Sequence, residues 1–263
     1  MRIAVASGKG GTGKTTVAVN LAYFNGLDLF DLDVEEPNAH HFIKGERTER
    51  YAYRKVPEVD EEKCNGCKTC SDVCKYSAMI VIEKAHPFPE LCHSCGACSY
   101  FCPEGAITEI DWITGKIVEV RGDIKLTYGE LKIGEATPVF LIKQIKKEIG
   151  KTAVVDCPPG TSCPMVECVI DADYVILVAE PTPFGLHDLK LAVKVVSDLG
   201  LKFGVVINKD GLPFKDLERY CRDEGIEILA RIPFSKEIAE KYSKGELLRD
   251  IEKTFKELFE AIS

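Results

Sequence analysis

The stretch Gly8-Lys9-Gly10-Gly11-Thr12-Gly13-Lys14-Thr15-Thr16 decides how the first part of this chain folds. It follows the apolar run 2–6, which has the length and composition of a buried parallel strand. It precedes residues 17–24, which are expected to form a helix. A strand, a glycine-rich loop and a helix are the context in which the pattern G-x-x-x-x-G-K-[ST] binds phosphate. The alternative is a glycine-rich turn without a ligand.

This loop has the residues needed to hold a nucleotide and its metal ion. The glycines let backbone N–H groups crowd around the phosphates, and the helix N-terminus adds partial positive charge. We expect Lys14 to reach the β- and γ-phosphates and the Thr15 hydroxyl to ligate Mg²⁺. The nucleotide-binding residues predicted in the loop are Gly8, Gly10, Gly11, Thr12, Gly13, Lys14, Thr15 and Thr16.

Lys9 points to a particular family of phosphate loops. A second lysine at the start of G-K-G-G-T-G-K-T-T resembles the deviant Walker A loop of the MinD/ParA superfamily of ATPases. That superfamily includes the nitrogenase iron protein and the Mrp-type iron–sulfur scaffold ATPases, and its signature lysine reaches across a homodimer to the partner's nucleotide. The resemblance implies an ATP-dependent homodimer in which Lys9 adds positive charge at the transition state, as an arginine finger does. The alternative is an exposed loop lysine.

Two acidic motifs resemble the switches of the same superfamily. Asp31-Leu32-Asp33 resembles switch I, whose second Asp positions or activates the attacking water, and this implies a catalytic role for Asp33. A carboxylate just past a parallel strand also lies where α/β proteins bind ligands. The alternative for Asp33 is a helix cap or a turn. Asp156-Cys157-Pro158-Pro159-Gly160 resembles switch II, so Asp156 is expected to hold Mg²⁺ directly or through water.

The base of the nucleotide has two expected contacts. Asn208 ends the apolar strand 203–208, where superfamily members read the adenine amino group. The stretch 231–234 resembles the loop that flanks the base, which implies a contact from Pro233. An Asn at a strand end is otherwise common as a turn former. The expected catalytic residues are Lys9, Lys14, Asp33 and Asp156.

Eight of the twelve cysteines lie between Cys64 and Cys102, in two runs with the spacing C-x₂-C-x₂-C-x₃-C. Such regular spacing indicates metal binding rather than disulfides. The runs resemble the bacterial two-cluster ferredoxin, in which three close cysteines hold one [4Fe–4S] cluster and the distant fourth ligates the other. The resemblance implies two ligand sets. They are Cys64, Cys67, Cys70 and Cys102 for cluster I, and Cys92, Cys95, Cys98 and Cys74 for cluster II.

The cysteine pattern leaves some alternatives open. Lys75 stands where a proline usually follows the fourth cysteine, although this removes no ligand. Zinc or a degraded cluster would also use cysteines, but a zinc ribbon has no use for the four-cysteine run. Cys163, just after the switch II motif, is either a ligand for a bridging cluster at a dimer interface or a buried free thiol.

The order of strands and helices predicts an α/β fold with a mostly parallel sheet flanked by helices. A small α+β ferredoxin-like domain is expected to interrupt it. We place a discontinuous P-loop ATPase domain at 1–57 and 112–263, and the inserted two-cluster domain at 58–111. Residues 40–60 are interpreted as a linker into the insert, in which Tyr51 and Tyr53 could lie on an edge strand. Residues 112–118 are interpreted as a short return hairpin.

The net charge and the lengths of the apolar runs limit the kinds of partner that the chain is expected to bind. The net charge of −8 and the pI near 5.3 argue against non-specific binding to nucleic acid or to an anionic membrane. The longest clean apolar run, 174–179, is too short to span a bilayer, so no stable membrane insertion is expected. The chain enters a strand at once, without a leader segment, and we expect a cytoplasmic protein.

These features predict an ATP-binding, Mg²⁺-dependent ATPase whose nucleotide-driven switch is coupled to electron transfer through two [4Fe–4S] clusters. Its partner would be an unidentified redox protein. One alternative is an iron–sulfur cluster carrier that serves an apo-protein, although the chain lacks the C-terminal C-x-x-C of Mrp-type scaffolds. Another is a MinD/ParA-like positioning switch in which the clusters only sense redox state.

Overall fold

The computed structural model describes all 263 residues and divides them into two compact units. Unit 1 comprises Met1–Glu49, Ile117–Glu130 and Ile142–Ser263, and unit 2 comprises Arg50–Lys116 and Leu131–Leu141. Residues 58–111, where the insert is expected, all belong to unit 2. No helix in the structure is both long enough and apolar enough to cross a membrane.

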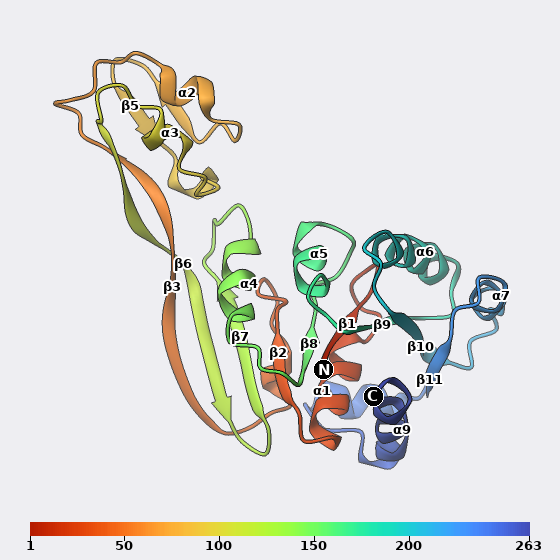
Figure 1. Cartoon of the computed structure of the whole chain (residues 1–263). Helices are drawn as coiled ribbons and strands as arrows, with labels where there is room; N and C mark the ends of the chain where they lie inside the picture. Colours follow the sequence, from red (N-terminus) through yellow and green to blue (C-terminus); the bar gives the residue numbers. More distant parts are fainter. The chain divides into compact units, whose positions relative to one another are not determined.

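A largely parallel sheet forms the centre of unit 1, and its strands β3 and β6 continue into unit 2 (Figure 1). The strand order is β11-β10-β9-β1-β8-β2-β7-β6-β3, and every pairing from β11 across to β7 is parallel. The predicted mostly parallel α/β sheet is therefore confirmed. The strands are β1 (Arg2–Ala6), β2 (Asp28–Asp31), β3 (Glu46–Val59), β6 (Ile107–Arg121), β7 (Lys125–Leu131), β8 (Ala153–Asp156), β9 (Tyr174–Ala179), β10 (Phe203–Asp210) and β11 (Ile228–Pro233).

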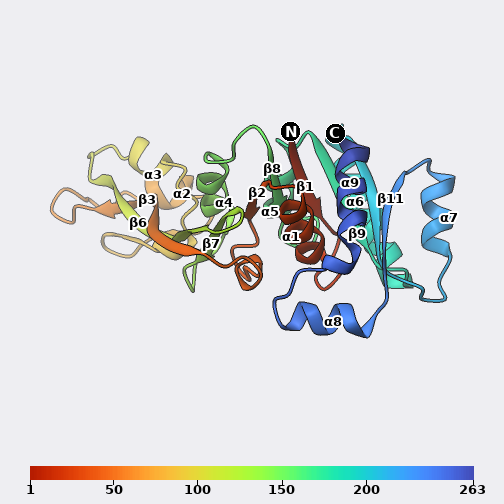
Figure 2. The same cartoon turned by 90° about the horizontal axis from the view of Figure 1, so that it is seen from below.

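Helices cover both faces of this sheet, with α1 and α9 side by side on one face and α5 and α6 on the other (Figures 1 and 2). Apolar side chains of α1 and α9, such as Leu21 and Phe255, pack against strand residues such as Ile3 in the main core. The helical elements are α1 (Lys14–Phe24), η1 (Ala39–His41), α4 (Val139–Lys146), α5 (Cys163–Val169), α6 (Pro183–Asp198), α7 (Asp216–Asp223), α8 (Lys236–Ser243), η3 (Arg249–Ile251) and α9 (Glu252–Ile262).

The central strands are short and almost wholly buried, which explains why their apolar runs were readable. In β1, β8 and β9 the side chains on both faces are covered by helices. Because β1, β2 and β8 run in parallel, their carboxyl ends meet at one edge of the sheet. The loops expected to bind the nucleotide all start from this edge.

Two local predictions need correction. The edge strand suggested at Tyr51 and Tyr53 is present, but as β3 it covers most of residues 40–60, which are therefore not a linker. Charged side chains are common on edge strands, where they face solvent, and they hid the strand pattern. Residues 112–118 are not a hairpin but the middle of β6, in which Gly115 keeps a strand conformation. The chain turns later, at 122–124, before β7.

Unit 2 contains a small domain of short elements. Its antiparallel strands β4 (Met79–Val81) and β5 (Ala85–Pro87) pair with each other. Its helical turns are α2 (Thr69–Val73), η2 (Pro89–Leu91) and α3 (Ala97–Tyr100). The buried apolar cluster consists of only four residues, Cys70, Met79, Ala85 and Ile107. Four more cysteines pack against it: Cys64, Cys74, Cys98 and Cys102. So small an apolar core contributes little stability, so this domain needs a further source of stability.

Candidate functional sites

The predicted phosphate loop connects β1 to α1 and is held by a side chain from another strand. Gly13 caps α1 with a left-handed backbone (φ 92°), which glycine adopts without steric cost. A Cβ on Gly13 would lie 2.1 Å from Nδ2 of Asn208. That amide group donates a hydrogen bond of 2.7 Å to the carbonyl oxygen of Thr12. Asn208 therefore positions the loop, and its contact with adenine stays a prediction.

The other loop residues lie in three settings. Lys14 and Thr16 are buried in the first turn of α1, and Thr15 is half-buried. Gly10 and Gly11 are exposed at the tip of the loop. Gly8 packs against α6, where an added Cβ would lie 2.1 Å from the carbonyl oxygen of Asp188. The two buried residues and the packed glycine anchor a loop whose tip is open to solvent.

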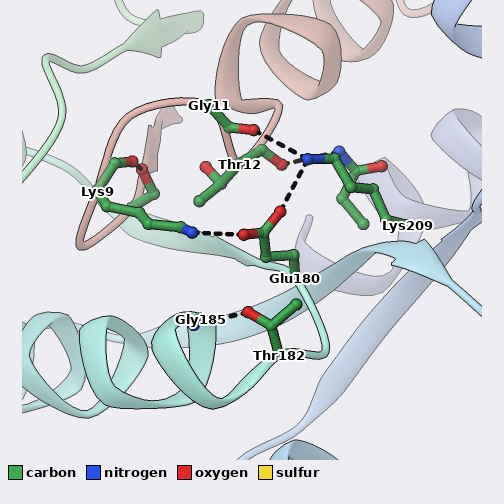
Figure 3. A network of polar contacts seen from close by, with 9 residues as sticks. Lys9, Gly11, Thr12, Glu180, Thr182, Gly185 and Lys209 are labelled. Atoms are coloured by element: carbon green, nitrogen blue, oxygen red, sulfur yellow. Dashed lines mark hydrogen bonds and ion pairs between the residues drawn. The ribbon is translucent and has the colours of Figure 1, made fainter. Parts of the chain in front are cut away.

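Lys9 is engaged by a carboxylate of its own chain. Its Nζ forms an ion pair with Oε1 of Glu180, at the carboxyl end of β9. The other oxygen of Glu180 accepts a 2.8 Å hydrogen bond from Nζ of Lys209, which also donates to the carbonyl oxygen of Gly11 at 3.3 Å. Figure 3 shows Glu180 between the two lysines. The pKa of Glu180 is lowered, because the two lysines outweigh the opposing effect of burial.

Two buried carboxylates meet at the sheet edge beside the loop. Asp31 and Asp156 end the neighbouring strands β2 and β8 and are register partners. Asp31 accepts hydrogen bonds from the backbone N–H groups of Asp33, Asn38 and Ala39, at 2.9–3.1 Å. Asp31 therefore organises the loop that carries Asp33. Asp156 is 1% exposed, and neither of its carboxylate oxygens has a hydrogen-bond partner.

Burial raises the pKa values of the three aspartates at this edge, Asp31, Asp33 and Asp156. Desolvation raises the pKa of Asp31 to about 6, against three opposing backbone hydrogen bonds. It also raises the pKa of Asp33 to about 6, with a further contribution from the charge of Asp31. Burial and the Asp31 charge raise the pKa of Asp156 well above its ordinary value, and the cation of Lys14 offsets only part of this. A bare, buried carboxylate next to Thr15 and Lys14 fits a cation ligand.

A pocket of about 250 Å³ opens next to the loop. Its lining brings the predicted residues Asn208 and Pro233 together with glycines of the phosphate loop. Aromatic side chains complete the wall. The lining residues are Gly11, Gly13, Thr16, Asn208, Lys209, Pro233, Phe234, Ser235, Ile238, Ala239 and Tyr242.

Sequence reasoning missed three residues of this site. Glu180 directly follows β9, and Lys209 lies near the end of β10, just after its apolar run. A charge at such a position was the signal that could have marked them. Asp31 was treated only as the first residue of the switch I motif. Its burial and its three backbone bonds show that it shapes the loop instead.

In unit 2 the eight spaced cysteines sort into two pockets of four. One pocket is lined by Cys64, Cys67, Cys70 and Cys102, and the other by Cys74, Cys92, Cys95 and Cys98. Each pocket thus takes three cysteines from one run and the fourth from the other run. No three His, Cys, Asp or Glu side chains converge closely enough to hold a single metal ion.

Backbone groups around these pockets point at sulfur. The N–H groups of Ala78, Ser94 and Ala106 each donate to a cysteine sulfur at 3.3 Å. Gly66 and Gly96, within the two cysteine loops, have left-handed backbones with φ of 72°. Such N–H···S contacts favour thiolate, the form that binds iron.

The remaining cysteines lie in unit 1 and differ in exposure. Cys163 is exposed at the start of α5. Cys157, Cys168 and Cys221 are buried among apolar groups. The alternative that Cys163 is a buried free thiol is therefore wrong, and its role as a ligand for a bridging cluster stays a prediction.

Known proteins resemble this chain over nearly its whole length. Residues 3–248 match the CobQ/CobB/MinD/ParA nucleotide-binding domain. An uncharacterised protein of Methanocaldococcus jannaschii is 34% identical over 94% of this chain and 90% of that protein. From the same organism, a protein named iron–sulfur cluster carrier protein is 24% identical over 93% of this chain and 76% of its own length.

Solved structures share the fold. The septum site-determining protein MinD of Pyrococcus horikoshii, complexed with Mg-ADP, matches with a TM-score of 0.60 at 20% identity. The match covers 100% of this chain and 95% of that one. Together with the matched phosphate loop, these findings show that the chain belongs to the CobQ/CobB/MinD/ParA family of nucleotide-binding P-loop proteins.

Proposed function

We propose that this protein is a Mg²⁺-dependent ATPase whose nucleotide state is coupled to electron transfer through two [4Fe–4S] clusters in unit 2. The observation that carries the proposal is the division of eight cysteines into two four-cysteine pockets, in a chain that also has a complete phosphate loop. The family match supports the nucleotide half of the proposal.

The nucleotide site has a residue for each task in hydrolysis. Lys14 is buried under the loop, where it would contact the terminal phosphates. Thr15 and the unpartnered carboxylate of Asp156 would hold Mg²⁺, which supplies charge neutralisation on the phosphates. Asp33 would orient the attacking water. Lys9 would act on the nucleotide of a second copy of the chain, in an ATP-dependent homodimer.

The pockets in unit 2 fit a four-iron cluster better than zinc. A zinc ribbon takes two C-x₂-C pairs around one ion and has no use for the run C-x₂-C-x₂-C-x₃-C. A [4Fe–4S] cluster takes one thiolate at each iron, so its four cysteines stand further apart around a shared hollow. The N–H groups that donate to Cys74, Cys92 and Cys102 suit thiolate ligands. When bound, the clusters would supply one-electron transfer.

The order of elements along the chain supports coupling between the two activities. The loop after β2 is bound by Asp31 and carries Asp33. The chain then passes through η1 into β3, which begins at Glu46 and continues into unit 2. A loop that responds to the γ-phosphate is thus followed directly by the strand that leads to the cysteines.

The midpoint potentials of the clusters test this proposal, measured in anaerobic protein with and without Mg-ATP. Coupling predicts a shift of at least about 59 mV, which is a tenfold change for a one-electron couple. Lys14→Ala is the control, because it should abolish the shift and leave the clusters in place. Equal potentials with and without nucleotide would overturn the coupling.

A second function has its own support, the likeness to relatives named iron–sulfur cluster carrier protein. In this alternative the clusters are cargo that the ATPase hands to an apo-protein. Cys67 and Cys95 are the exposed members of the two pockets, where a recipient thiol could attack first. Transfer of iron and sulfide to an apo-ferredoxin, dependent on ATP and lost in Lys14→Ala, would favour the carrier. Clusters that stay bound under these conditions would favour the electron carrier.

A further inference from the structure

A buried arginine lies behind the pocket of Cys74, Cys92, Cys95 and Cys98. The side chain of Arg54, on β3, is 2% exposed, and that of its ion-pair partner Glu135 is 1% exposed. Arg54 lies in the charge-rich stretch that the sequence marked as a linker. A charge so deeply buried is costly unless every hydrogen-bonding group around it is satisfied.

The two edges of the Arg54 guanidinium serve different partners. Nε and Nη2 face Oε2 of Glu135, at 2.9 and 2.8 Å. Nη1 donates to the carbonyl oxygen of Cys92 at 2.9 Å, and Nη2 also donates to that of Pro89 at 2.6 Å. The guanidinium is a rigid planar fork, so these bonds fix the backbone just before and at the first cysteine of the second run.

Glu135 is itself held in place. Its Oε1 accepts a 2.7 Å hydrogen bond from Nε1 of Trp112, and Thr114 donates to Oε2 at 3.4 Å. The ring of Phe140 lies against Arg54, 5.8 Å from the guanidinium carbon. The carboxylate is therefore anchored on the side of the guanidinium that carries Nε. The edge that carries Nη1 is therefore free to bind the backbone of the Cys92 loop.

The charge of Arg54 lies next to the second cysteine run. Its Nη1 donates to the carbonyl oxygen of Cys92, and its side chain is shielded from water. A cation that favours thiolate also favours any further negative charge placed in the same pocket. The carboxylate of Glu135 offsets part of this charge, but it lies on the Nε side of the guanidinium, so the Cys92 loop faces the positive end of the ion pair. Burial weakens screening by water, which strengthens the influence of the nearer charge.

The other pocket has a weaker counterpart. Nζ of Lys84 donates to the carbonyl oxygen of Cys64, the first cysteine of the first run. Each pocket thus has one cation on the carbonyl of its first cysteine. Lys84 is only half-buried and has a flexible stem, whereas Arg54 is enclosed and paired.

We propose that Arg54 is a positioning residue for cluster II, which locks the Cys92 loop and holds the reduction potential of that cluster above the value it would have without the guanidinium. Lys84 acts in the same sense, and more weakly, on cluster I. This inference rests on the proposed two-cluster function. Reduction adds one electron and one negative charge to a cluster, and a nearby buried cation stabilises the reduced form.

The test is a redox titration of the whole anaerobic protein with dithionite, followed by electron paramagnetic resonance. The main variant is Arg54→Gln with Glu135→Gln, because removing Arg54 alone would leave Glu135 buried and unpaired. We expect two reduction steps in the parent protein. In the double variant the potential of one step should fall, so that the ratio of reduced to oxidised cluster at a given potential drops at least tenfold. The potential of the other step should not change.

Lys84→Gln is the matched variant. It should move the step that the double variant leaves in place, and by a smaller factor. If the double variant retains both clusters and neither step moves, or both move equally, the assignment to Arg54 is overturned. Iron and sulfide analysis of the parent protein separates this outcome from failure of the proposed function, because a chain without two four-iron clusters would fail there first.

Arg54→Lys keeps the charge and loses the planar fork. We expect the potentials of this variant to stay close to those of the parent. A chelator should remove half of its iron, that of cluster II, faster than it removes iron from the parent. If iron loss follows the parent's rate in a single phase, the positioning role of Arg54 is wrong. This variant also keeps the proposal testable if the double variant does not fold.

Discussion

Lys9 and Glu180 form an ion pair within one chain, and the same carboxylate also binds Lys209. The amine that the family resemblance assigns to a partner's nucleotide is therefore held against its own subunit. A dimer that uses Lys9 in trans has to break this ion pair first. In such a dimer the contact would oppose assembly until nucleotide and partner offered Lys9 a better position.

Replacing Glu180 by Gln should ease that release. Because the Lys9 and Glu180 side chains are 31% and 11% exposed, solvent screens the ion pair only in part. We expect Glu180→Gln to tighten Mg-ATP-dependent self-association several-fold, measured by sedimentation velocity across a range of protein concentrations. Lys209→Met is the control, since it keeps the pair of Lys9 and Glu180. Weaker association in Glu180→Gln would show that the pair supports the dimer instead.

Lys9→Ala should separate binding from hydrolysis. Lys9 lies at the entrance of the loop and makes no contact that holds the loop's glycines, so nucleotide affinity should stay within about twofold. Loss of a charge delivered in trans should slow hydrolysis by about a thousandfold or more, as for an arginine finger. The measurements are Kd for a fluorescent ADP and kcat for ATP. A fully active monomer at every protein concentration would contradict the trans role.

Asp33 should make the stability of the nucleotide-free protein depend on pH. Its folded pKa of about 6 exceeds the ordinary value of 3.8, so the folded state binds the proton more tightly than the unfolded state. The resulting stabilisation is present at low pH and is lost as pH rises from about 4 to about 6. Asp33→Asn should therefore gain stability relative to the parent across that window, by about 1 kcal/mol after allowing for solvent screening.

Urea unfolding of both proteins at a series of pH values would measure this difference. Glu35→Gln, at an exposed carboxylate two residues further on, is the control and should show no such trend. A constant difference between Asp33→Asn and the parent at all pH values would show that Asp33 is not perturbed by the site.

Two glycines of unit 2 offer a matched pair of variants. Gly66 and Gly96 share the same φ of 72°, so an alanine at either is strained by about 1 kcal/mol. At Gly66 the added Cβ would also lie 2.4 Å from the carbonyl oxygen of Glu83, whereas at Gly96 the nearest atom is a Glu109 side-chain oxygen at 3.6 Å. Gly66→Ala should lose about half of the bound iron, and Gly96→Ala should keep nearly all of it. Iron analysis after anaerobic reconstitution checks this, and equal loss in both variants would contradict it.

Much of unit 1 could be predicted from the sequence because its strands are buried on both faces. An unbroken apolar run such as that of β9 has few alternatives, and the polar residue that ends such a run lies at the sheet edge. Asp156 was predicted in this way, whereas Lys14 was predicted from the phosphate-loop pattern and Asp33 from the resemblance to switch I. The raised pKa values of Asp33 and Asp156 could not be predicted, because they depend on burial and on the register of β2 against β8.

The residues that escaped prediction are those whose partners lie far away along the chain. Glu180 meets Lys9 across 171 positions, and Arg54 meets Glu135 across 81. A charge-rich stretch such as that around Arg54 normally marks solvent, since no local pattern tells a paired, buried charge from an exposed one. The same limit hid the full length of β3, in which alternate residues are buried in the second half.

The facing acids Asp31 and Asp156 have one more consequence. The two carboxylates are in register, and one of them has no hydrogen bond, so their mutual repulsion destabilises this edge of the sheet when no ligand is bound. A divalent cation with its nucleotide would relieve that repulsion, so the energy of ligand binding would also hold unit 1 together. Resistance to unfolding then rises with the concentration of the ligand. We therefore expect the supply of ATP to govern how long each molecule survives proteolysis, as well as how fast it works.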